Sequence, residues 1–68
     1  MSEDPAEILK RGADRVASMI VTSGTSELDC ALAERELRGL CLSLLPSKMD
    51  LYERIYASRF QRLREQFR

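Results

Sequence analysis

The chain has 68 residues, which is enough for one small domain and too few for a large catalytic core. Its hydrophobic content of 44% and charged content of 32% are typical of a folding protein and exclude the apolar-poor, highly charged class that stays disordered. Eleven basic residues balance eleven acidic ones, so the chain has no overall positive field to attract nucleic acid or an acidic membrane.

The first predicted helix spans residues 5–22. Asp4 can cap its N-terminus, Pro5 suits the first helical position, and Glu7 stands three residues after the cap. Apolar residues then recur at intervals of three and four, as on one buried helical face: Ile8, Leu9, Ala13, Val16, Met19 and Ile20. Gly12 lies on the same stripe, where it most simply allows a neighbouring helix to approach closely.

The second predicted helix spans residues 27–45 and follows a cluster of turn-forming residues at 22–26. Ser26 can cap it, with the acid Asp29 three positions later. One apolar stripe of this helix consists of Cys30, Ala33, Leu37, Leu40, Cys41 and Leu44. On the opposite side stand further apolar residues, next to Ala31, Arg35 and Gly39: Leu28, Leu32 and Leu42. Since a helix in a two-layer structure needs one buried face, the second face predicts either a central position or contact with another chain.

The third predicted helix spans residues 48–67, because Pro46 ends the second one. Ser47 is its predicted cap, with Asp50 at the third helical position. Its apolar stripe consists of Met49, Tyr52, Tyr56, Phe60, Leu63 and Phe67. This stripe contains all four aromatic residues of the protein. Residues in a terminal turn usually fray, so an apolar row that continues to Phe67 indicates that something covers it.

These three segments predict an all-α protein, a three-helix up-down-up bundle forming a single domain over residues 1–68. A core of this size seldom supplies more than about 3 to 5 kcal/mol, so we expect dimerisation to complete the bundle. The side chains expected in the core are Leu9, Val16, Ile20, Leu37, Leu40, Leu44, Tyr56 and Leu63.

The residues that usually carry chemistry are sparse. The chain has no histidine, the commonest general base and metal ligand, and the acids at the start of the second helix suit its dipole. Cys30 and Cys41 would be about 16 Å apart along one helix, too far for a disulfide, so we expect two reduced core thiols. The acidic N-terminal segment does not resemble a signal peptide. We therefore expect a cytoplasmic protein with no enzymatic activity, no cofactor and no metal.

Two classes of function remain. The favoured hypothesis is a protein-interaction module, a regulator, adaptor or chaperone-like subunit, whose partners are a second copy of itself and another, unidentified protein. Its expected contact residues are Leu28, Leu32, Leu42, Phe60 and Phe67. The alternative is a nucleic-acid-binding regulator, because six basic residues against three acidic ones lie in residues 48–68. Its expected contact residues are Arg54, Arg59, Arg62, Arg64 and Arg68.

Overall fold

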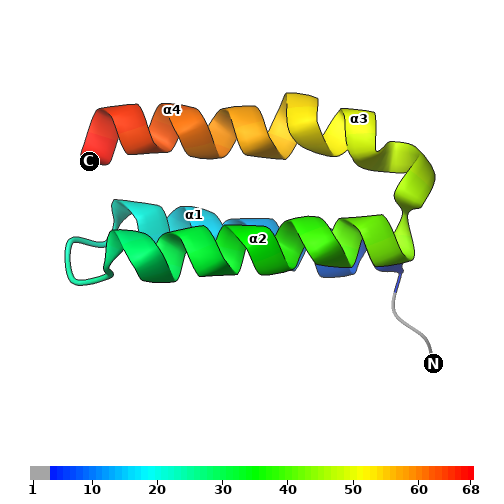
Figure 1. Ribbon diagram of the computed structural model, residues 1–68, viewed down its shortest axis with the longest axis horizontal. Coiled ribbons are helices and arrows are strands. Elements are labelled where there is room, and N and C mark those ends of the chain that lie inside the picture. The colour runs from blue at the N-terminus through cyan, green and yellow to red at the C-terminus, as the bar shows by residue number, and fades with distance from the viewer. Residues whose placement is uncertain (1–3) are drawn as a thin grey trace.

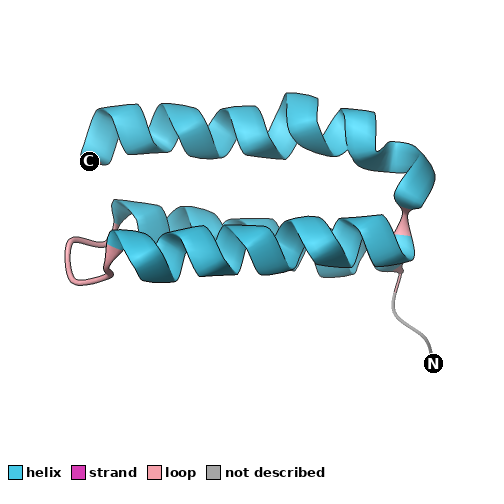
Figure 2. Ribbon diagram, viewed as in Figure 1, coloured by secondary structure: helices cyan, strands magenta, loops and turns pink. Residues whose placement is uncertain are grey.

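The computed structural model describes residues 4–68, which form three helical rods (Figure 1). The first rod is α1 (Pro5–Val21) and the second is α2 (Glu27–Leu44). The third rod, residues 46–67, consists of a 3₁₀ turn (η1, Pro46–Lys48), α3 (Met49–Tyr52), a π-helical turn (η2, Glu53–Ala57) and α4 (Ser58–Phe67). Successive rods run in opposite directions, and Figure 2 shows only helices and short connections over the described residues. The predicted all-α fold of three helices is confirmed; residues 1–3 of the predicted domain, which begin the acidic N-terminal segment, lie outside the described part.

Two of the three predicted helix starts have the expected caps. The Asp4 carboxylate accepts a hydrogen bond of 3.0 Å from the Ala6 amide, and the Ser26 hydroxyl accepts one of 3.1 Å from the Asp29 amide. The cap predicted at Ser47 is wrong. Leu45 leaves the helical conformation with φ −138°, and the chain re-enters it through η1 without a side-chain cap.

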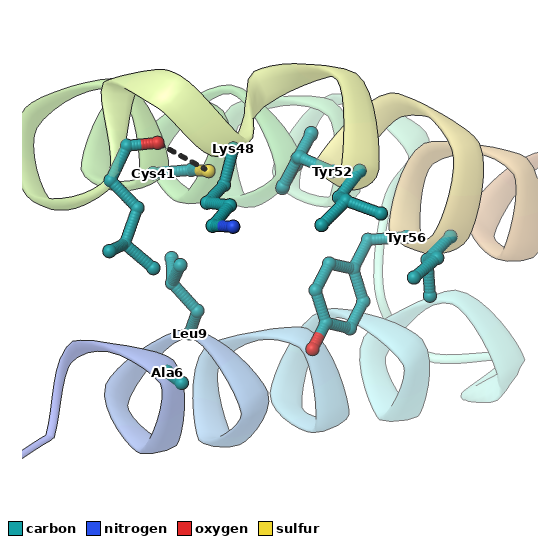
Figure 3. Close-up of a pocket in the computed structure, with 9 residues that line it drawn as sticks. Ala6, Leu9, Cys41, Lys48, Tyr52 and Tyr56 are labelled. Atoms are coloured by element: carbon teal, nitrogen blue, oxygen red, sulfur yellow. Dashed lines mark hydrogen bonds between the residues drawn. The ribbon is translucent and has the colours of Figure 1, made fainter.

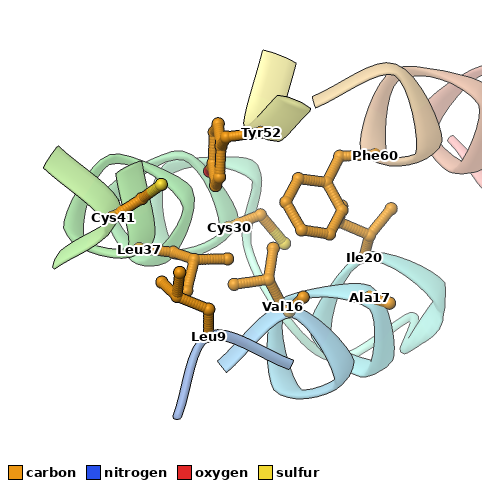
Figure 4. Packing of buried hydrophobic residues seen from close by; sticks show 10 residues of the cluster. Leu9, Val16, Ala17, Ile20, Cys30, Leu37, Cys41, Tyr52 and Phe60 are labelled. Atoms are coloured by element: carbon orange, nitrogen blue, oxygen red, sulfur yellow. The ribbon is translucent and has the colours of Figure 1, made fainter. Parts of the chain in front are cut away.

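The core is built from all three rods, as Figure 4 shows. Ten apolar side chains are buried: Leu9, Ala13, Val16, Ala17, Ile20, Cys30, Leu37, Cys41, Tyr52 and Phe60. α1 packs against both α2 and α4, so its small residues allow two neighbours to approach one helix. Both cysteines are unpaired core thiols, as predicted.

The predicted core needs one correction. The four residues buried as expected are Leu9, Val16, Ile20 and Leu37, and three more are half-buried: Leu44, Tyr56 and Leu63. Leu40 is 37% exposed, so its assignment to the core is wrong. It lies at the open edge of the seam between α1 and α2, beside Arg15 and Glu36, where no element of the third rod covers it.

The π-helical turn explains which aromatic residues reach the core. In a regular α-helix two residues eight positions apart differ by about 80° in direction, so Tyr52 and Phe60 would stand at opposite edges of the apolar stripe. The wider turn η2 lies between them and takes up part of that rotation. Tyr52 is 3% exposed and Phe60 is fully buried, so both face the other two rods.

Gly12 faces Leu37 of α2, as its place on the apolar stripe predicts. A Cβ added at Gly12 would stand 2.6 Å from Cδ1 of Leu37, a buried core side chain. A Cβ added at Gly39, in the middle of α2, would meet nothing within 4 Å. The absence of a side chain at Gly12 therefore leaves room for the Leu37 side chain, whereas the space at Gly39 is not filled by any atom of the described residues.

Alanine at these two glycines should have opposite effects. Both substitutions gain about 1 kcal/mol of helix propensity, but only Gly12→Ala forces Leu37 to move, at a cost of about 1 to 3 kcal/mol for overpacking. We expect Gly39→Ala to raise the free energy of unfolding. The free energy of unfolding of Gly12→Ala should lie about 1 to 3 kcal/mol below that of Gly39→Ala. Urea unfolding at low protein concentration measures both, and equal stability of the two variants would contradict the close contact.

Candidate interaction surface

The outer side of α2 carries three exposed leucines, which we call the α2 leucine face: Leu28, Leu32 and Leu42. They are 68%, 48% and 53% exposed, respectively. The buried residues of α2 are Cys30, Leu37 and Cys41, on the opposite side of the helix, so the face points away from the core. The structure therefore brings these three predicted contact residues together on one surface that nothing in residues 4–68 covers.

The other two predicted contact residues lie on α4 and behave differently. Phe60 is 0% exposed and belongs to the core, so its assignment to a contact surface is wrong. Helical spacing places Phe60 on the apolar stripe of the third rod but does not show that α1 and α2 enclose it. Phe67 is 53% exposed, but it stands on a different rod from the α2 leucine face.

Most of the predicted nucleic-acid contacts are engaged within the protein. Nε of Arg64 donates to Oε1 of Glu27 at 2.9 Å, and its Nη2 lies 2.5 Å from Oε2 of Glu34. Arg59 pairs with Asp14 at 3.8 Å. Partial burial disfavours the charge of Arg64, but the two carboxylates more than offset this and raise its pKa above the ordinary value. These ion pairs join the third rod to α1 and α2.

The Arg68 side chain donates hydrogen bonds to carbonyl groups at the end of α1 and in the connection to α2. Its Nε donates to the carbonyl of Ile20 at 2.7 Å, and its Nη2 donates to three more carbonyls, those of Met19, Thr22 and Thr25, at 3.1, 3.1 and 2.6 Å. Its side chain is only 20% exposed. Arg54 and Arg62 are thus the two predicted nucleic-acid contacts for which no ion pair occurs in the described residues.

An apolar groove of about 260 Å³ opens between the start of α1 and the third rod, and we call it the α1–α3 groove (Figure 3). Its lining residues are Ala6, Leu9, Cys41, Leu45, Lys48, Leu51, Tyr52, Ile55 and Tyr56. α1 packs on α4 rather than on α3, which leaves this end of the bundle open. The side chains of Lys48 and Tyr56 extend into the groove in Figure 3.

Two side chains that line the α1–α3 groove, Cys41 and Tyr52, have raised pKa values. Burial raises the pKa of the Cys41 thiol, so the thiolate is disfavoured. Burial, reinforced by Glu34 and Glu53, raises the pKa of Tyr52 to about 12. The groove therefore offers an apolar contact surface with one ammonium group, from Lys48.

No family model, curated protein or solved structure matches this chain. Within residues 4–68, no group of three or more cysteine, aspartate or glutamate side chains is arranged to hold a metal ion. In the same part of the chain, no helix has the length and apolar character needed to cross a membrane.

Proposed function

We propose that this protein is a non-enzymatic, helical protein-interaction module that works as a homo-oligomer, most simply a two-fold dimer. The observation that carries the proposal is the α2 leucine face, three large apolar side chains on one exposed side of one helix. Clustered apolar surface of this kind marks contact sites on soluble proteins, and burying it removes the cost of its hydration. A dimer would complete the bundle by covering α2 on its open side.

The arrangement of charge favours this function over nucleic-acid binding. Arg59, Arg64 and Arg68 are held by carboxylates or carbonyls of the chain itself, and a phosphate would have to displace these partners. The net charge of zero supplies no long-range attraction. We keep nucleic-acid binding as the alternative, carried by Arg54 and Arg62.

The same proposal places the protein in the cytoplasm and gives it a second protein partner. Two buried free thiols suit a reducing compartment. The α1–α3 groove lies apart from the α2 leucine face, and its lining includes the exposed side chains of Leu51 and Ile55. It would stay open in a dimer formed through α2, so the second protein could bind there as an apolar helix with an acidic residue facing Lys48.

Replacement of Leu32 by aspartate should abolish self-association. In sedimentation equilibrium at micromolar to high micromolar concentration, the wild type should exceed its monomer mass of 7.8 kDa, whereas Leu32→Asp should remain at that mass. Leu32 is 48% exposed in the monomer, so circular dichroism should show the variant folded. Leu51→Asp is the matched control, because Leu51 is 45% exposed on the other surface, and it should associate like the wild type.

Two results would contradict the proposal. A wild type that stays monomeric throughout this range would rule out self-association. Dissociation caused by Leu51→Asp but not by Leu32→Asp would show that the chain associates through the α1–α3 groove side and not through the α2 leucine face. A titration with duplex DNA at two salt concentrations tests the alternative function. Tight, salt-sensitive binding that is lost in an Arg54→Ala/Arg62→Ala variant would favour a nucleic-acid-binding regulator.

A further inference from the structure

We propose that the α1–α3 groove binds a medium-chain fatty acid, a saturated carboxylate of about eight to ten carbon atoms, whose carboxylate pairs with Lys48. This inference goes beyond the proposed function, because it assigns a small ligand to a surface that self-association through α2 leaves open. The grounds are the lining of the groove, its volume and its single charge.

The lining of the groove is apolar apart from that charge. Lys48 is the charged residue among the nine that line the groove, and the other eight have aliphatic, aromatic or cysteine side chains. Leu51 and Ile55 are exposed, so part of this apolar surface is in contact with water. An alkyl chain that displaces this water should gain about twofold to fourfold in affinity for each methylene that it buries.

The volume of the groove sets the size of the ligand. An apolar cavity of about 150 Å³ in another protein holds one benzene ring. The α1–α3 groove, at about 260 Å³, has room for rather less than twice as much, or about ten carbon atoms. A helix is about 10 Å across with its side chains, so a partner helix would lie over the groove without filling it. The volume therefore favours a single alkyl chain.

Lys48 supplies the group that recognises a carboxylate. Its side chain extends into the groove in Figure 3, and its ammonium forms no ion pair or hydrogen bond within residues 4–68. The side chain of Tyr56 extends into the same groove, and its hydroxyl forms no hydrogen bond in that part of the chain. A cation at an apolar groove binds an anionic head group while the chain lies among the aliphatic side chains. The ligand is therefore an amphiphile with a negative end.

The π-helical turn is a second, independent feature of this site. η2 supplies Ile55 and Tyr56 to the lining of the groove. Turns of this kind are rare in helices and frequently stand at functional sites. The turn precedes α4, the part of the third rod on which α1 packs, so the groove lies at the end of the bundle that this contact leaves open.

Titration with saturated carboxylates tests the site, each ligand being kept below the concentration at which it forms micelles. Amide NMR signals should shift most at Leu9, Leu51 and Ile55, and least at Leu28 and Leu32 of the α2 leucine face. The affinity should rise about twofold to fourfold per methylene from hexanoate to decanoate and then level off, because a longer chain outgrows the groove. The absence of shifts with millimolar decanoate would overturn the inference and leave the groove to a partner helix. An affinity that rises equally steeply from decanoate to tetradecanoate would also overturn it.

Two variants of the groove test the charge and the apolar lining separately. Lys48→Met keeps an unbranched side chain without the charge, so it should weaken octanoate binding about twofold to fivefold and leave octanol binding unchanged. Ile55→Asp should weaken the binding of both ligands at least about tenfold, and circular dichroism should show it folded, since Ile55 is exposed. Wild-type octanoate affinity in Lys48→Met would overturn the carboxylate pairing.

Leu32→Asp is the matched control on the other surface, and it separates this inference from the proposed function. It should bind octanoate like the wild type although it is expected to be a monomer. Loss of octanoate binding in Leu32→Asp would overturn the groove as the binding site. Octanoate binding by a wild type that never self-associates would support the groove and reject the proposed dimer.

Discussion

Phe60→Ala should leave the protein largely unfolded at 25 °C. Phe60 is the largest of the fully buried side chains, and it fills the space between α4 and the other two rods (Figure 4). Truncation of a buried phenylalanine costs about 3 to 5 kcal/mol, because apolar contact is lost and a cavity remains. A core of this size supplies about 3 to 5 kcal/mol in total, so little stability would be left.

Phe67→Ala is the matched control, since the same change is made on the same helix. Phe67 is 53% exposed and should lose no more than about 1 kcal/mol at low protein concentration, where self-association does not contribute. Urea unfolding followed by circular dichroism compares the two variants with the wild type. Similar losses in the free energy of unfolding at both positions would mean that Phe60 is less buried in solution than in this structure.

The contrast between Phe60 and Phe67 also shows how far the sequence can predict this fold. Polar caps and helical spacing locate the first two helices to within one residue, because both signals are local. Nothing local announces the π-helical turn, which depends on how the third rod packs on its neighbours. Phe60 and Phe67 both lie on α4, beyond that turn and seven residues apart, so they share one side of the helix, and only packing makes the first buried and leaves the second exposed.

The same distinction applies to the candidate site. The α2 leucine face is visible in the sequence because Leu28, Leu32 and Leu42 oppose a complete apolar stripe on one uninterrupted helix. The engagement of the arginines is not visible, because their partners are remote along the chain. Arg64 and Glu27 are 37 residues apart, and Arg68 and Ile20 are 48 apart. A count of basic residues on the third rod thus overstates the charge available to a phosphate backbone.

Arg68 supplies what α1 lacks at its own C-terminal end. The last turn of α1 contains no basic residue. The Met19 carbonyl accepts a hydrogen bond of 3.3 Å from the Thr22 amide, and the Ile20 carbonyl accepts none from the backbone of the described residues. The guanidinium group reaches both, together with the carbonyls of Thr22 and Thr25 in the connection to α2. One side chain therefore ties α4 to the end of α1 and to the start of the next helix.

Arg68→Ala should lower the free energy of unfolding by about 1 to 3 kcal/mol, because several carbonyls lose a charged donor at once. Arg68→Lys should recover less than half of this loss, since a single ammonium cannot reproduce the planar fork that serves four acceptors. Arg62→Ala is the control: Arg62 is exposed and has no ion pair in the described residues, so its loss should stay within about 0.5 kcal/mol. Urea unfolding gives the three stabilities, and hydrogen exchange should show faster opening of residues 19–25 in Arg68→Ala. Full recovery by lysine would mean that charge alone, and not the fork of hydrogen bonds, holds the end of α1.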